Sequence, residues 1–254
     1  MKTKPLIVAN WKMNLLPSQE ADLAKKYAQA FARLAKKVEI IICPTHTGLA
    51  GVAEQLRGSA LVLGAQDVSG EMVGAFTGEV SAAMLKELGV THCIVGHSER
   101  RQRVHETDEM VNAKTRAVLV EGMIPIVCVG ESYEERLNGQ KEVMVLQRLT
   151  AAMKNVSGER PVVITYEPIW AISPGGPASP AEVEPMVSLI RQTLRDLFPA
   201  ELVEKNFRII YGGSVEGDNV KDFLGLDHVE GALVGAASLL TARFTKIIQS
   251  ASKL

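Results

Sequence analysis

The sequence predicts an α/β fold, and within that class a closed (β/α)8 barrel formed by one domain over residues 1–254. Eight short, mostly β-branched apolar runs alternate with longer segments in which apolar residues recur at helical spacing. This alternation is typical of βαβ units in a parallel sheet. The runs are apolar almost throughout, as expected of strands buried on both faces. Eight such strands fit a closed barrel better than an open doubly wound sheet, which usually has about five or six.

The expected strands are spread along the whole chain. They are the runs Leu6–Val8, Ile40–Ile42, Leu61–Leu63, Cys93–Val95, Ile124–Val127, Val162–Ile164, Arg208–Ile210 and Ala232–Val234. The segment 21–34 is expected to form one of the intervening helices, because apolar residues recur there at helical spacing: Leu23, Tyr27, Ala30, Phe31 and Leu34. The Pro and Gly cluster at 174–180 lies inside one connection between a strand and a helix, so it does not divide the chain into domains.

The composition is that of an ordinary globular protein, with 46% hydrophobic residues, 22% charged residues and a net charge of −1. Nucleic acid and anionic membranes are not expected partners, because the Lys25-Lys26 and Lys36-Lys37 pairs fit the solvated face of a helical pattern. The first eight residues lack the apolar stretch of a signal peptide, and no segment approaches about eighteen uninterrupted apolar residues. A cytoplasmic location is therefore expected.

The three cysteines, Cys43, Cys93 and Cys128, lie inside apolar runs, far apart in the sequence and without the spacing of metal ligands. They are expected to be buried small hydrophobic residues. Neither a dinucleotide fingerprint nor a P-loop nor an HExxH motif is present, so no metal or cofactor is expected.

Residues just past each strand of a parallel barrel converge on one mouth. The residues found there are Asn10 and Lys12 after the first strand, His97 and Glu99 after the fourth, Glu167 after the sixth, Gly212, Gly213 and Ser214 after the seventh, and Gly235 and Ala236 after the eighth. A carboxylate, an imidazole, an ammonium group and two glycine-containing turns are thus expected at one face.

Glu167 ends an apolar run and precedes Pro168 and Trp170. Partial desolvation would raise its pKa and make it a better base, although a structural ion pair is the alternative. His97 begins the segment after the fourth strand, where the positive end of a helix disfavours the imidazolium form; a capping or core histidine is the alternative. The other histidines, His46, His92, His105 and His228, are expected to be structural.

Lys12 is placed to neutralise a phosphate or a developing enolate, while a Schiff-base role and a simple surface lysine remain alternatives. The turns 211–214 and 234–238 follow the seventh and eighth strands, where barrels often bind phosphate through backbone N–H groups. Gly also simply marks tight turns. Together, these residues indicate proton abstraction next to a carbonyl of a small phosphorylated substrate, with Glu167 as base and His97 as electrophile.

The chain resembles triosephosphate isomerase along its whole length. The motifs that carry the resemblance are NWKMN at 10–14, GAFTGE at 74–79, VGHSERR at 95–101, YEPIWA at 166–171, YGGSV at 211–215 and GALVG at 231–235. The family interconverts dihydroxyacetone phosphate and D-glyceraldehyde 3-phosphate through an enediolate, on a TIM barrel, in glycolysis and gluconeogenesis. The resemblance implies no cofactor and no metal.

The resemblance also assigns roles to individual residues. It implies that Glu167 moves a proton between two carbon atoms, that His97 serves the oxygens, and that Asn10 and Lys12 hold the substrate. Glu99 is similar to a family residue that supports Lys12 and the proton transfer, with a helix N-terminal charge as the alternative. The phosphate contacts implied are Ser173, Ser214, Gly235 and Ala236.

Members of this family are usually homodimers, in which the loop after the third strand reaches into the partner. The resemblance extends to this loop: Gln66 and Asp67 open it, Phe76, Thr77 and Gly78 lie within its motif, and Glu79 closes it. Thr77 matches the residue inserted near the neighbouring active site, so a homodimer is expected.

The lid departs from the family pattern. The first hinge, Pro168-Ile169-Trp170, matches, as do the latch residues Tyr211 and Ser214, but the usual Ile-Gly-Thr-Gly-Lys-Thr-Ala is replaced by ISPGGPA at 172–178. Ser173 keeps its N–H but precedes Pro174, which favours an extended conformation. The lid also contains Gly175, and its second hinge is Gly176-Pro177-Ala178. This hinge joins a residue of free φ to one of fixed φ, so closure of the lid is expected to be harder.

Two further features flank the lid and the phosphate turn. The SPAE sequence at 179–182 predicts a capping box with proline at the first helical position. Ala236 stands where many family members have a second Gly, and its methyl group puts phosphate affinity in question while leaving the N–H donor in place.

Two other functions compete with a working isomerase. The altered lid suggests a catalytically weakened barrel that binds phosphorylated ligands as a sensor or scaffold. A barrel aldolase or another sugar-phosphate isomerase would usually need a Schiff-base lysine within a strand, and none of the eight runs contains a lysine.

Overall fold

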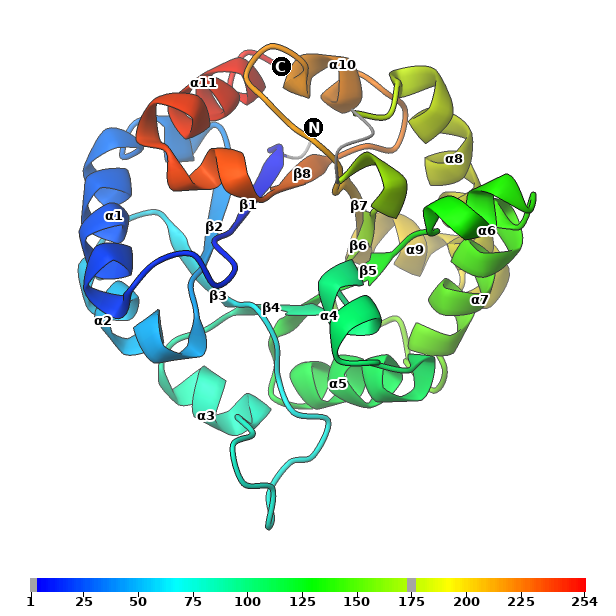
Figure 1. Ribbon diagram of the computed structural model, residues 1–254, viewed down its shortest axis with the longest axis horizontal. Coiled ribbons are helices and arrows are strands. Elements are labelled where there is room, and N and C mark those ends of the chain that lie inside the picture. Colours follow the sequence, from blue (N-terminus) through cyan, green and yellow to red (C-terminus); the bar gives the residue numbers. More distant parts are fainter. Residues whose placement is uncertain (1–3, 173–176) are drawn as a thin grey trace.

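The computed structural model describes residues 4–172 and 177–254 of the chain. Its strands form the closed parallel barrel that the sequence predicts, and they pair in sequence order with β1 beside β8 (Figure 1). The strands are β1 Leu6–Asn10, β2 Glu39–Cys43, β3 Val62–Ala65, β4 His92–Val95, β5 Ile124–Val129, β6 Val162–Tyr166, β7 Phe207–Tyr211 and β8 Gly231–Val234. Each predicted run overlaps one of them, so the predicted fold class is confirmed.

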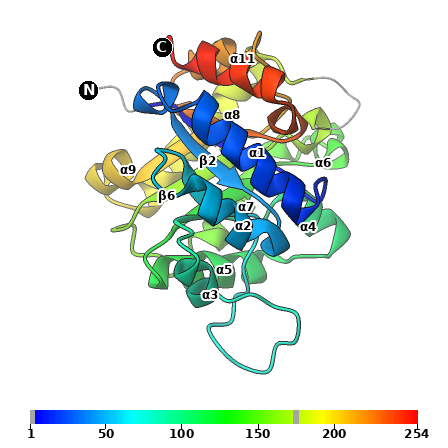
Figure 2. The ribbon, with the colours of Figure 1, turned by 90° about the vertical axis from the view of Figure 1, so that its left-hand side faces the viewer.

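The helices form a ring around the barrel (Figure 1), and Figure 2 shows the same ring from the side. The α-helices are α1 Pro17–Ala30, α2 Leu49–Leu56, α3 Ala82–Glu87, α4 Ser98–Arg103, α5 Asp108–Val120, α6 Tyr133–Leu137, α7 Lys141–Ala152, α8 Pro180–Leu197, α9 Ala200–Asn206, α10 Val220–Leu224 and α11 Thr241–Ala251. Short 3-10 helices are η1 Leu34–Lys36, η2 His46–Gly48, η3 Ile169–Ala171 and η4 Ala236–Leu239. Among the described residues, no helix is both long and apolar enough to cross a membrane.

Alternate side chains of each strand pack on opposite sides of the barrel wall. Ile7 and Ala9 of β1 belong to the large apolar cluster between strands and helices, whereas Leu6 and Val8 belong to a smaller cluster of strand residues inside the barrel. The inner cluster consists of Leu6, Val8, Ile41, Cys43, Ile94, Ile126, Cys128, Val163, Ile210 and Leu233. Both faces of the strands are therefore buried, which explains why the strands are near-continuous apolar runs.

The helix expected over 21–34 is displaced: α1 spans Pro17–Ala30. It begins earlier because Pro17 suits the first turn, where its missing N–H is not needed, and because the Gln19 side chain accepts a hydrogen bond from the Leu16 N–H at 2.9 Å. After Ala30, which is exposed, the chain turns into η1, although Phe31 stays buried against Tyr27. Apolar residues recur at helical spacing through this turn as well, so the predicted helix ended too late in the sequence.

The segment between β3 and α3 protrudes from the side of the barrel as a loop (Figures 1 and 2). Its base is closed by the Ser69 N–H, which donates to the Val80 carbonyl at 2.8 Å. Residues 71–79 are all exposed, and Val73 is 89% exposed. The Phe76 side chain, also exposed, stacks on the backbone of Gly74, where a Cβ would lie 2.8 Å from the ring. The tip of the loop thus presents apolar side chains to solvent.

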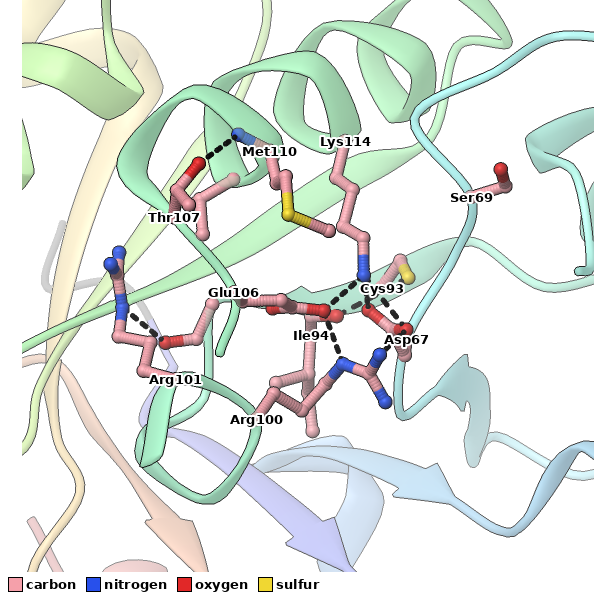
Figure 3. A network of polar contacts seen from close by, with 12 residues as sticks. Asp67, Ser69, Cys93, Ile94, Arg100, Arg101, Glu106, Thr107, Met110 and Lys114 are labelled. Atoms are coloured by element: carbon pink, nitrogen blue, oxygen red, sulfur yellow. Dashed lines mark hydrogen bonds and ion pairs between the residues drawn. The ribbon is translucent and has the colours of Figure 1, made fainter. Parts of the chain in front are cut away.

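A group of four charged side chains, buried except for Arg100, joins this loop to α4 and α5 (Figure 3). Lys114 donates to both carboxylate oxygens of Asp67, at 2.7 and 2.9 Å, and also contacts Glu106. Arg100 contacts Glu106 and lies 3.0 Å from Asp67. Burial raises the pKa of Asp67 despite the attraction of Lys114, so this carboxylate depends on its cations to stay ionised. The group ties the base of the protruding loop to the helix that follows β4.

We predict that Lys114→Met lowers the free energy of unfolding by about 3–5 kcal/mol, because it leaves two buried carboxylates facing a single arginine. Urea unfolding at pH 7 and fixed protein concentration measures the change. Lys25→Met, on the exposed face of α1, is the control and should stay within about 0.5 kcal/mol of the parent. A Lys114→Met protein as stable as the control would show that the cluster does not need this cation.

Candidate active site

Glu167 is the first residue after β6 and continues the inward-facing series that includes Val163. Its N–H donates to the Val129 carbonyl at 2.7 Å, which fixes its backbone to the neighbouring strand. The side chain is only 2% exposed and passes across Gly212, where a Cβ would lie 2.8 Å from the Glu167 Cγ. Its Oε2 accepts a hydrogen bond from the Ser98 N–H at 3.1 Å. A buried carboxylate is thus held at the barrel mouth by backbone contacts.

His97 caps the N-terminus of α4, and its Nδ1 accepts a hydrogen bond from the Glu99 N–H at 3.2 Å. An acceptor Nδ1 carries no hydrogen, so the neutral ring has its hydrogen on Nε2. Nε2 lies 3.1 Å from the Glu167 Oε1. That contact does not meet hydrogen-bond geometry, and Oε1 has no hydrogen-bond partner among the described residues. One imidazole N–H and one carboxylate oxygen are therefore available side by side.

Lys12 has φ of 52°, a left-handed conformation that is costly for a residue with a side chain. Two side chains hold it there: the Asn10 Oδ1 accepts from the Lys12 N–H at 3.1 Å, and the Gln66 Nε2 donates to the Lys12 carbonyl at 3.0 Å. The ammonium group donates to the Glu99 Oε1 at 2.8 Å. It also passes beside Gly235, where a Cβ would lie 3.7 Å from the Lys12 Nζ. The strained backbone thus directs Lys12 to the turn after β8.

Glu99 is held as a carboxylate by this contact. Burial alone would raise the pKa of Glu99, but hydrogen bonding and charge attraction from Lys12 outweigh burial, so the pKa lies below its ordinary value. Lys12 and Glu99 form a partly exposed ion pair between the strand-one and strand-four sides of the mouth.

These side chains surround a cleft of about 240 Å3. Its wall includes the side chains of Asn10, Lys12, His97 and Glu167, the turns Gly212–Ser214 and Gly235–Ala237, and Glu216 and Arg243. The structure thus brings together the residues that the sequence predicted at the mouth, apart from Glu99, which lines an adjoining hollow. The cleft suits a small anionic molecule, because backbone N–H groups and two cations face it.

The first hinge is anchored on both sides. The Trp170 Nε1 donates to the Glu131 Oε1 at 2.7 Å, and the Ile169 N–H donates to the Glu131 carbonyl at 3.0 Å. On the other side, the Ser214 hydroxyl donates to the Ala171 carbonyl at 2.8 Å. Pro168 precedes these contacts and is buried. Ser214 therefore contacts the hinge directly, in addition to lining the cleft.

The expectations for Ser173, Gly175 and Gly176 lie outside the described residues. Pro177 is exposed, whereas Ala178 is buried and its backbone faces the hydroxyl of Tyr211. Burial raises the pKa of Tyr211.

The capping box after the lid is present as predicted. Glu182 Oε2 accepts from the Ser179 N–H at 2.9 Å, with Pro180 at the first position of α8.

The structure shows three contributions that the sequence did not predict. Gln66, expected only in the dimer loop, braces Lys12 within its own chain. Glu131, fully buried, holds Trp170 and Tyr166. Glu131 follows the end of β5 at the barrel mouth. The rule that residues just past each strand converge at the mouth also applies to the fifth strand, and it would have identified Glu131. Arg243, which lines the cleft, gives no signal in the sequence because it comes from α11.

Two of the remaining histidines, His46 and His92, and the cysteines have structural surroundings. His46 Nε2 lies 2.8 Å from the Asp67 carbonyl, and His92 is paired with the Thr91 hydroxyl at 2.8 Å. Burial lowers the pKa of His92 to about 4. The three cysteines are buried, as expected. Within residues 4–172 and 177–254, no His, Cys, Asp and Glu side chains gather in a group that could hold a metal ion.

Comparison with known proteins agrees with this geometry. The family model for triosephosphate isomerase matches residues 5–251. The chain is 43% identical over 249 residues to the triosephosphate isomerase of Caldanaerobacter subterraneus subsp. tengcongensis, covering 96% of this chain and 98% of that protein. It is 45% identical over 246 residues to that of Chloroflexus aurantiacus, with the same coverage. The chain belongs to the triosephosphate isomerase family.

A solved structure supports the same assignment. The crystal structure of triosephosphate isomerase from Bartonella henselae is similar with a TM-score of 0.86 and 33% identity, over 98% of this chain and 99% of that one. The protein is thus a triosephosphate isomerase homologue, an isomerase of a small phosphorylated triose on a TIM barrel, and the resemblance found in the sequence is confirmed. The aldolase alternative is set aside.

We predict that nitrogen NMR of the His97 ring at neutral pH shows hydrogen on Nε2 and a bare Nδ1, because a backbone N–H occupies Nδ1. His92 serves as an internal reference for a buried ring. A His97 signal with hydrogen on Nδ1 would contradict the donor and acceptor roles derived above.

Proposed function

We propose that Glu167 is the base of the triosephosphate isomerase reaction and that His97 is the group that serves the substrate oxygens. The observation that carries the proposal is the meeting of Glu167 Oε1 and His97 Nε2 at 3.1 Å, on the wall of a cleft that Lys12 also lines. Glu167 takes a proton from the hydroxymethyl carbon of dihydroxyacetone phosphate. Meanwhile, the His97 Nε2–H donates to the carbonyl oxygen, where negative charge develops.

The resulting enediolate collapses in the other direction. Glu167 returns the proton to the neighbouring carbon, and His97 moves a proton between the two oxygens, which gives D-glyceraldehyde 3-phosphate. Two properties of Glu167 support this role: it is almost completely buried, and one of its oxygens has no hydrogen bond among the described residues. The other oxygen, Oε2, accepts a hydrogen bond from the Ser98 N–H.

The substrate phosphate is proposed to lie at the turns after β7 and β8. Lys12 passes beside Gly235, and the backbone of Gly213, Ser214 and Ala236 lines the same cleft. Asn10 holds the Lys12 backbone, and Glu99 holds its ammonium group, so we assign both to positioning Lys12.

Shortening the base should strongly slow the reaction. In Glu167→Asp the carboxylate withdraws by about one C–C bond, roughly 1.5 Å, and the rate should fall by about 10²-fold or more. Steady-state isomerisation of D-glyceraldehyde 3-phosphate measures the rate, and methylglyoxal is counted in the same assay. An altered lid that closes poorly would admit water, and the enediolate would then lose phosphate as methylglyoxal.

The matched control for this experiment is Glu184→Asp, an exposed position of α8, which should keep the parent rate. A Glu167→Asp protein as fast as this control would remove Glu167 from the reaction. An inactive parent that still binds phosphate would instead return the protein to the sensor or scaffold class.

We further propose that the protein is a homodimer in which the loop 69–80 of one subunit docks on the other. The support is the exposed apolar tip of the loop and a hollow of about 300 Å3 beside the active site. That hollow is lined by Lys12, His97 and Glu99, together with Met13, which is 93% exposed. A partner loop carrying Thr77 would cover Met13 and exclude water from the Lys12 side of the site. A cytoplasmic location stays a prediction from the sequence.

Sedimentation equilibrium should give a mass of twice the 27.5 kDa chain. Phe76→Asp should lower that mass toward one chain and reduce activity, because it places a charge in the apolar contact. Val120→Asp, at an exposed apolar position of α5, should remain dimeric. A parent protein with the mass of a single chain would refute the proposed assembly.

A further inference from the structure

The cleft contains a second cation that has no part in the proposal above. Arg243, in the first turn of α11, lines the same cleft as Lys12 and the two phosphate turns. Its Nε donates to the Glu216 Oε2 at 3.1 Å, and its Nη2 contacts the other carboxylate oxygen. The planar guanidinium of Arg243 and the planar carboxylate of Glu216 therefore meet edge to edge. Guanidinium groups bind phosphate with the same two-bond geometry.

Glu216 is held in place by the loop after β7. Its N–H donates to the Asn219 Oδ1 at 2.8 Å, and the Asn219 Nδ2 donates to the Ser214 carbonyl at 3.1 Å. Ser214 lies in the turn proposed to bind phosphate. The backbone of Glu216, whose carboxylate contacts Arg243, is thus fixed two residues from that turn.

Both cations at the cleft are paired with carboxylates before substrate enters. Lys12 is paired with Glu99, and Arg243 is paired with Glu216. The Arg243 and Glu216 side chains are 47% and 41% exposed, and ion pairs of this exposure contribute little to stability. A phosphate dianion at the neighbouring turn is therefore an effective competitor for the guanidinium group.

We propose that Arg243 is a second phosphate-binding cation, which exchanges its carboxylate partner Glu216 for the substrate phosphate and favours phosphorylated over unphosphorylated substrates. This inference rests on the proposed function, because it places the phosphate at the same turns. Glu216 acts in the opposite sense: it occupies Arg243 in the free enzyme and repels the incoming dianion. The pair therefore sets substrate affinity, whereas proton transfer takes place at Glu167.

The test compares Arg243→Gln with Glu216→Gln. Arg243→Gln should raise the KM for D-glyceraldehyde 3-phosphate and the inhibition constant of inorganic phosphate by about fivefold each, with kcat little changed. Glu216→Gln should lower both constants, because it frees Arg243 and removes a negative charge. If the pair had a purely structural role, KM and the inhibition constant would change in the same direction in both variants, and that result would overturn the inference. Constants that are unchanged in both variants would also overturn it.

Two controls sharpen the result. Arg195→Gln breaks a comparably exposed ion pair, Arg195 with Glu204 at 2.7 Å, whose residues do not line the cleft, and it should leave KM unchanged. With unphosphorylated D-glyceraldehyde, parent and Arg243→Gln should have equal kcat/KM, since no phosphate is present. A parent that does not isomerise the phosphorylated substrate refutes the proposed function. An active parent whose two variants shift together refutes only the role of Arg243.

Discussion

Side chains on a strand point alternately to its two sides, and in a closed barrel surrounded by helices both sides are buried. The inward positions of this chain fill with apolar side chains such as Val8, Val163 and Leu233. The inward positions become polar toward the carboxyl ends of the strands. Asn10 and Glu167 occupy such positions, in step with Val8 and Val163. The packing of the barrel and the placement of the site thus follow from the same two-residue period.

Electrostatic pairing is the second organising feature. Three cations each contact at least one carboxylate: Lys12, Arg243 and the buried Lys114. None of these three is therefore an isolated charge. The pairs differ in burial, and this difference separates their roles. Lys114 and its two carboxylate partners are nearly inaccessible and hold structure together, whereas the pairs at the mouth are partly exposed and can exchange partners. Exposure therefore distinguishes charges that stabilise the fold from charges that meet the substrate.

The sequence predicted those features that depend on residues close together along the chain. The strands were found because both-sided burial makes them short continuous apolar runs, and the capping box at Ser179 was found because its partners are three residues apart. The start of α1 at Pro17 was missed because the apolar period does not mark a first turn made of proline and polar residues.

Long-range contacts of the site were missed for a different reason. The brace from Gln66 to Lys12 spans 54 positions, and the Arg243 contact with Glu216 spans 27. In both contacts, no sequence motif and no spacing of apolar residues links the two partners. The residues after the strands could be collected in advance because topology brings strand ends together, whereas Arg243 enters the cleft from a helix.

The left-handed backbone of Lys12 has a consequence for how the protein can evolve. Glycine adopts this conformation at less cost than lysine, and removing such strain ordinarily stabilises a fold. The most stabilising residue at position 12 is thus one that carries no charge into the cleft. Selection for stability alone would favour glycine at this position, so a lysine there exchanges stability for a charge at the cleft.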